Sequence, residues 1–117
     1  PKLPERAKNI ILDEANEIFY STASVWEITI KHMLHPDKIR INGDLLAKGC
    51  EDNGYMVLPV FNKHVSALET LKRLENAPPH NDPFDRIMIA QAKAENLMFL
   101  THDSLIPYYG EPFIISV

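Results

Sequence analysis

Three acidic residues in this chain of 117 residues stand where they could bind a metal ion together. Asp103 follows the strand-like run 98–102 directly, and Asp85 comes three residues after Asp82, a residue type that often caps helices. Glu27 lies among apolar and β-branched neighbours, where an unpartnered charge is costly. Converging carboxylates repel one another unless a cation neutralises them, and ligation by oxygen alone selects Mg²⁺ or Mn²⁺.

A divalent ion held by such acids supports one particular class of reaction. It can activate water and stabilise the charge on a phosphate during in-line attack, which makes metal-assisted phosphodiester hydrolysis the chemistry that follows. Each acid also has a structural explanation that the sequence leaves open. Asp103 suits a turn, Asp85 is favoured by the dipole of a helix, and Glu27 can pair with Lys31 four residues later.

The elements that must position these acids alternate between helix and strand. Apolar spacing and capping residues predict helices over 4–14, 22–34, 44–53, 62–75 and 83–96. Short β-branched and aromatic runs predict strands over 17–21, 55–60, 98–101 and 113–117. This alternation indicates an α/β domain in which helices cover a parallel sheet, and ligands of such a sheet collect beyond the carboxyl ends of its strands.

Composition narrows the class of protein. Hydrophobic residues make up 45% and charged residues 24%, which fits one globular domain over 1–117 and excludes a disordered or collagen-like chain. The single cysteine, Cys50, cannot form an internal disulfide, and it favours a reducing, cytoplasmic location. The net charge of -4 argues against a protein that coats DNA through clustered positive charge. No apolar run is long enough to cross a membrane.

The segments that carry the acids resemble those of PIN domains. Ser21–Ile28, STASVWEI, is similar to the strand-to-helix motif of that family. His80–Ala92, HNDPFDRIMIAQA, resembles its most specific motif, and Leu100–Asp103, LTHD, resembles the next strand with its terminal acid. The resemblance covers nearly the whole chain, is greatest to VapC-type toxins of bacterial toxin–antitoxin pairs, and implies a three-layer α/β/α domain with a short parallel sheet.

The resemblance also implies an activity, a site and partners. It implies an endoribonuclease that depends on Mg²⁺ or Mn²⁺ and cleaves RNA, forms a homodimer, and has an antitoxin partner that blocks its active site. Glu27, Asp85 and Asp103 match the family's second, third and fourth acids, whose role is to bind the metal. Thr101 matches a hydroxyl position that hydrogen-bonds an acid or water near the metal.

Other polar residues in the same motifs receive smaller roles. Ser21 is a weaker hydroxyl candidate of the same kind as Thr101. Asp82 and Arg86 are interpreted as a helix cap and its local partner. His80 is interpreted as a loop residue that could contact RNA, although a loop histidine has no special role by default.

The chain departs from the family pattern at its beginning. PIN domains open with a central strand that ends in an aspartate, and no such strand precedes the helix near Pro4. Asp13 lies only 14 residues before Glu27, at the end of a predicted helix, and is rejected as the first acid. We therefore expect the opening strand and one metal ligand to be missing, which exposes two strand edges. A fragment or a misplaced or truncated gene start is favoured over a partner chain that supplies the strand.

Two functions of different classes remain open. The first is a PIN-type endoribonuclease toxin. The second is a catalytically inactive remnant that only binds an antitoxin or another copy of itself, and the missing acid favours it. A phosphatase-like enzyme with Asp103 as nucleophile is disfavoured, because the chain has only four glycines and no glycine-rich phosphate loop.

Overall fold

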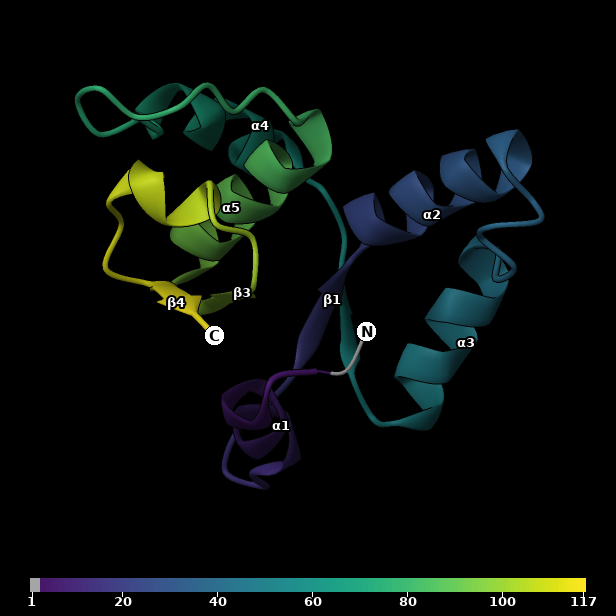
Figure 1. Ribbon diagram of the computed structural model, residues 1–117. Coiled ribbons are helices and arrows are strands. Elements are labelled where there is room, and N and C mark those ends of the chain that lie inside the picture. The colour runs from purple at the N-terminus through teal and green to yellow at the C-terminus, as the bar shows by residue number, and fades with distance from the viewer. Residues whose placement is uncertain (1–2) are drawn as a thin grey trace. The chain divides into compact units, whose positions relative to one another are not determined.

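The computed structural model describes residues 3–117, which form two compact units (Figure 1). The first unit combines residues 3–13 with Phe61–Val117, and the second consists of Glu14–Val60. Each unit has its own helices and its own pair of parallel strands.

The order of helices and strands follows the predicted alternation. The second unit contains β1 (Phe19–Ser21), α2 (Thr22–Leu34), α3 (Gly43–Asp52) and β2 (Met56–Leu58). The first unit contains α1 (Glu5–Leu12), α4 (Asn62–Ala67), the 3₁₀ turn η1 (Leu68–Thr70), α5 (Pro83–Glu95), β3 (Phe99–Thr101), the 3₁₀ turn η2 (Ile106–Tyr109) and β4 (Ile114–Ser116). The predicted α/β class is confirmed.

The strands pair in parallel, as the alternation predicts, but in two separate pairs. In the first pair, Tyr20 of β1 lies opposite Val57 of β2. In the second pair, Leu100 of β3 lies opposite Ile115 of β4. Within residues 3–117 no further strand joins either pair, so each strand has one neighbour and one edge without a strand partner.

One predicted helix is considerably shorter in the structure. The helix predicted over 62–75 ends at Ala67, continues for one 3₁₀ turn, and is followed by extended backbone at Leu71. The Leu71 side chain is buried in the core, and the Leu74 backbone N–H donates to the Tyr108 carbonyl oxygen at 2.7 Å. These tertiary contacts replace the helical hydrogen bonds that local apolar spacing predicts, because spacing alone carries no information about such distant partners.

The core of the first unit surrounds α5. Ile89 and Ala90 are completely buried, and they pack with Leu71, Ile106 and Tyr109. Burial extends through Gln91 and Ala92, so one full turn of α5 is enclosed. Burial of apolar side chains is the main favourable term in folding, so α5 is a fixed support for the residues at its beginning.

Two interactions fasten other parts of the first unit to this core. Arg6 of α1 donates from Nη1 to the Ser116 carbonyl oxygen of β4 at 3.0 Å. Glu95, in the last turn of α5, lies 2.7 Å from both His64 Nε2 and Lys63 Nζ of α4. The hydrogen bonds from Lys63 and His64 hold the pKa of Glu95 below its usual value, so its carboxylate is ionised at neutral pH.

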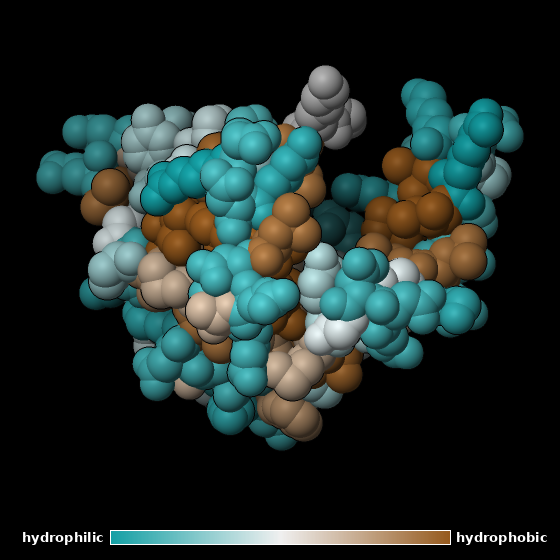
Figure 2. All heavy atoms as spheres, turned by 90° about the horizontal axis from the view of Figure 1, so that it is seen from below, coloured by the Kyte–Doolittle hydropathy of each residue, from teal (hydrophilic) through white to brown (hydrophobic). Residues whose placement is uncertain are grey.

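In the second unit, α2 packs against α3 and β1 pairs with β2. Gly43 begins α3 and is buried against Val25 and Thr29 of α2. Large apolar side chains of α2, including Trp26, Met33 and Leu34, are exposed. Figure 2 shows that apolar side chains also reach the molecular surface in several places among hydrophilic ones. Among the residues described, no helix has the length and apolar character that a membrane span requires.

The close approach of α3 to α2 gives a first testable prediction. In Gly43→Ala, the new Cβ would collide with the Thr29 hydroxyl and lie 3.0 Å from Val25 Cγ1. We expect a loss of about 1–3 kcal/mol in the free energy of unfolding, measured by urea denaturation, because the added methyl group would overpack the contact between α2 and α3.

Gly49→Ala is the matched control on the same helix, because a Cβ at Gly49 meets no atom within 4 Å. Alanine is the better helix former, so this variant should gain about 0.5–1 kcal/mol. Equal effects of the two substitutions would contradict the packing described here.

Candidate metal centre

The first turn of α5 is fixed by Asp82. Its Oδ1 accepts the backbone N–H groups of Phe84 at 2.9 Å and of Asp85 at 3.0 Å. Pro83 occupies the first helical position, where the lack of an N–H costs nothing. The predicted capping role of Asp82 is confirmed, and its consequence is a defined position for Asp85 in the first helical turn.

The second acid follows the carboxyl end of β3. The buried Thr101 hydroxyl accepts the Asp103 backbone N–H at 3.0 Å, and Asp103 Oδ1 accepts the Leu105 N–H at 2.7 Å. Thr101 was predicted to hydrogen-bond an acid or water near the metal, and in the structure its hydroxyl shapes the backbone of the turn that presents Asp103. Asp103 itself is exposed.

A third residue joins the two acids. His80 precedes α5 and is buried, with a relative exposure of 8%. Its Nε2 lies 3.1 Å from Asp85 Oδ2, and its Nδ1 lies 2.8 Å from the Tyr109 hydroxyl. The two rings meet edge to face with centroids 5.5 Å apart. His80 lies in a loop, as the sequence indicates, and its burial disfavours the contact with RNA that the sequence left open.

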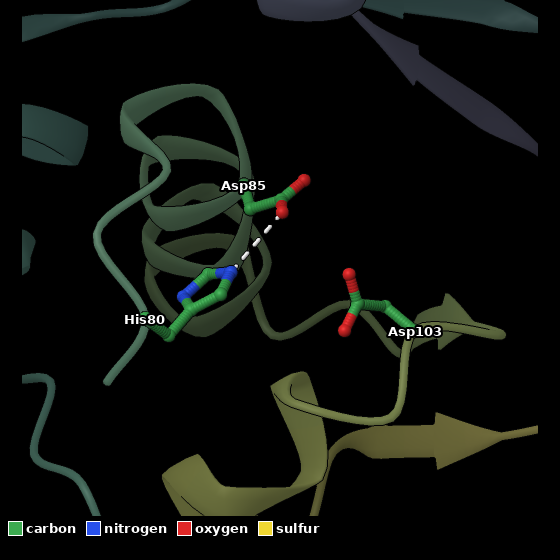
Figure 3. A group of neighbouring side chains, drawn as sticks. All are labelled: His80, Asp85 and Asp103. Atoms are coloured by element: carbon green, nitrogen blue, oxygen red, sulfur yellow. Dashed lines mark hydrogen bonds and ion pairs between the residues drawn. The ribbon is translucent and has the colours of Figure 1, made fainter. Parts of the chain in front are cut away.

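His80, Asp85 and Asp103 form one cluster, shown in Figure 3. Each offers one ligand atom, and these atoms lie within 4.8 Å of one another. The structure therefore brings together two of the three predicted acids, from the start of α5 and the end of β3. It adds a histidine whose role sequence reasoning missed, although the residue lies in the same HNDPFD run as Asp85.

Glu27, the remaining predicted ligand, belongs to the other unit. It lies in α2 with 19% of its side chain exposed, and its Oε2 is 3.2 Å from Lys31 Nζ. The ion pair that the sequence left open as an alternative is therefore formed. Ser21 caps the same helix by accepting the Ala23 N–H at 3.0 Å. A metal-binding role for Glu27 stays a prediction.

The electrostatics of the cluster suit a cation. Burial raises the pKa of Asp85, and the nearby charges of Asp82 and Asp103 act in the same direction. The hydrogen bond from His80 opposes this rise. A partly desolvated carboxylate beside other carboxylates gains most from a positive ion, and two carboxylates are a donor set that Mg²⁺ and Mn²⁺ accept. The residues present therefore fit a divalent cation.

Removal of the α5 cap gives a second prediction. Asp82→Ala leaves two backbone N–H groups without their acceptor, and the free energy of unfolding should fall by about 1 kcal/mol. Asp44→Ala is the control, because Asp44 lies in the first turn of α3 but Asn42 supplies that helix's cap. It should cost less. An unchanged free energy of unfolding in Asp82→Ala would contradict the stabilising role of this cap.

The raised pKa of Asp85 gives a third prediction, for the metal-free protein. A carboxyl group whose pKa is higher in the folded chain than its ordinary 3.8 favours folding when it is protonated. That contribution is lost as the pH rises through the folded pKa. Asp85→Asn carries no charge, so we expect it to be more stable than the wild type at pH 7. The difference should shrink as the pH falls towards about 4.

Urea denaturation of both proteins in EDTA, across this pH range, measures the difference directly. A variant that is less stable than the wild type at pH 7, or a difference that does not depend on pH, would contradict the described burial of Asp85.

Comparison with known proteins assigns the chain to a family. Searches of curated proteins and of solved structures found no match. A model of the PIN domain family, however, matches residues 1–111, which include the second unit, most of the first unit and all residues of the cluster. Because this match covers nearly the entire sequence and agrees with the α/β architecture, the chain belongs to the PIN domain family.

Proposed function

We propose that this PIN domain is an endoribonuclease that depends on Mg²⁺ or Mn²⁺ and hydrolyses phosphodiester bonds in RNA. PIN domains are generally nucleases and typically bind divalent metals. The observation that carries the proposal is the approach of Asp85 and Asp103, whose ligand atoms lie within 4.8 Å of each other beside a buried histidine.

The proposed ligands are Asp85 and Asp103, with Glu27 as the third acid that the family resemblance implies. A bound divalent ion would activate water and stabilise negative charge on the phosphate. The protein's own residues keep the acids in place. His80 holds Asp85 Oδ2, and the Leu105 amide holds Asp103 Oδ1. Each acid is thus restrained through one oxygen while its other oxygen is left for a cation.

The proposal extends to a toxin of the VapC type that acts in the cytoplasm as a homodimer. Its regulator would be an antitoxin protein that covers the active site. The exposed apolar side chains of α2, at Trp26, Met33 and Leu34, support a protein partner, because large apolar groups at a surface are often covered in a complex.

A second candidate function is a non-catalytic module that binds only proteins. The observation that favours it is the ion pair between Glu27 and Lys31, which already neutralises one of the three proposed ligands. On this alternative, the cluster of His80, Asp85 and Asp103 would have a structural role only.

Cleavage of single-stranded RNA in the presence of Mn²⁺ separates the two functions and is the fourth prediction. The wild-type chain should cleave, and Asp85→Asn should lose about 100-fold or more in rate, because removal of a metal ligand raises the barrier by several kcal/mol. The control is Asp44→Asn, which changes an exposed acid of α3 outside the cluster.

Each outcome has a distinct meaning. Cleavage that requires Asp85 and Mn²⁺ supports the endoribonuclease. Equal cleavage by Asp85→Asn and the wild type would show that the proposed site is wrong. No cleavage by the wild type, together with no Mn²⁺ binding in calorimetry, would favour the protein-binding module.

A further inference from the structure

A chain of two hydrogen bonds connects the core to the proposed metal ligand. It runs from the Tyr109 hydroxyl to His80 Nδ1 at 2.8 Å, and from His80 Nε2 to Asp85 Oδ2 at 3.1 Å. Tyr109 and His80 are both buried, with relative exposures of 5% and 8%. The family resemblance assigns metal binding to three acidic residues and gives neither Tyr109 nor His80 a role at the metal.

The chemistry of Asp85 and Tyr109 determines which atom donates in each of the two hydrogen bonds. An ionised carboxylate has no proton to donate, so the bond between His80 and Asp85 requires a hydrogen on Nε2. In a neutral imidazole the other nitrogen is then an acceptor, and the Tyr109 hydroxyl is the donor that satisfies it. The Asp85 carboxylate therefore selects the Nε2–H tautomer, and the Tyr109 hydroxyl satisfies the remaining nitrogen and orients the ring.

Arg73 holds the segments that carry the tyrosine and the histidine at a fixed separation. Its guanidinium donates to the Pro78 carbonyl oxygen, two residues before His80, and to the Leu105 carbonyl oxygen near η2, both at 2.7 Å. The same group lies over the Tyr109 ring, 4.6 Å from the centroid. A planar cation with several donors can make all these contacts at once. The fold thus sets the geometry of the two hydrogen bonds between Tyr109, His80 and Asp85 before any ligand binds.

We propose that Tyr109 and His80 are positioning residues for Asp85. The Tyr109 hydroxyl bonds Nδ1 and so orients the His80 ring, and the Nε2–H holds Asp85 Oδ2, so that the second carboxylate oxygen remains available to a divalent cation. The inference rests on the proposed function in that Asp85 is taken as a metal ligand. It gives His80 a role as a donor to the carboxylate, in place of a role as a metal ligand through Nε2.

The first test uses the metal-free protein and does not depend on activity. Nitrogen-15 NMR of the imidazole rings at pH 7.5 distinguishes the Nε2–H tautomer from the Nδ1–H tautomer and from the charged ring. His80→Gln identifies the His80 signals among those of the five histidines. We expect the Nε2–H tautomer in the wild type and in Tyr109→Phe, and a changed Nδ1 resonance in Tyr109→Phe, because Nδ1 then loses the hydrogen bond from the Tyr109 hydroxyl.

Tyr108→Phe is the matched control, because Tyr108 is exposed and also lies beneath Arg73. It should leave the His80 spectrum unchanged. An Nδ1–H or doubly protonated ring in the wild type would overturn the proposal. So would an Nδ1 resonance that is the same in Tyr109→Phe as in the wild type.

The second test measures Mn²⁺ affinity by calorimetry. Tyr109→Phe and His80→Ala should weaken binding about tenfold, the usual size of an effect from residues that orient a ligand. His80→Gln should recover most of the affinity, because its amide N–H can still donate to Asp85. Unchanged affinity in His80→Ala would contradict the positioning role.

Pulsed electron paramagnetic resonance of the Mn²⁺ complex then distinguishes positioning from ligation. A positioning role predicts no coupling from a directly bound imidazole nitrogen, and such a coupling would overturn the inference. Failure of the proposed function is recognised separately. The wild type would then bind no Mn²⁺, whereas the effect of Tyr109 on the His80 Nδ1 resonance would still be measured in the metal-free protein.

Discussion

The repulsion between two neighbouring carboxylates, one of them partly buried, is the physical constraint on which the arrangement of the candidate site depends. Asp85 and Asp103 repel, and burial makes the charge on Asp85 still less favourable. The fold offsets this cost with fixed donors. The Asp82 cap places the first turn of α5, the Leu105 amide holds Asp103, and His80 holds Asp85. A site that is prepared in this way loses stability without a cation and regains it when a cation binds.

The parts of this site that the sequence predicted are those determined by local interactions. Asp82 followed by proline is a strong helix start, because cap and proline act within one turn. Asp103 was placed at a sheet edge by the apolar strand just before it. The environment of His80 could not be predicted in this way, since its partner Tyr109 lies 29 residues further along the chain. Local apolar spacing likewise overestimated the length of the helix at 62–75, because a carbonyl of η2 takes the Leu74 N–H.

The distinction between local interactions and partners that are distant in the sequence also applies to the strands and to Glu27. Parallel pairing followed from the alternation of helix and strand, whereas the number of strands per sheet depends on long-range hydrogen bonds, and these form two separate pairs. For Glu27 the sequence allowed two explanations, a metal ligand or an ion pair with Lys31. The ion pair could be predicted from helix geometry alone, because residues four apart lie on the same face of a helix. That ion pair is formed. Because Lys31 is exposed, the ion pair contributes little to stability, so a cation that binds Glu27 more strongly can displace Lys31.

The enclosed turn of α5 has a consequence for the timescale on which the site can change. Residues Ile89 to Ala92 occupy four successive positions at about 100° each, so buried side chains cover about 300° of the helix circumference. No face of this turn is free to separate from the core by itself, and its amide hydrogens should exchange with solvent only when the whole unit opens. Asp85 lies one turn away on the same helix. Its carboxylate is therefore attached to a helix that is anchored in the core of the first unit, and the site should keep its form through the fast local motions that displace surface loops.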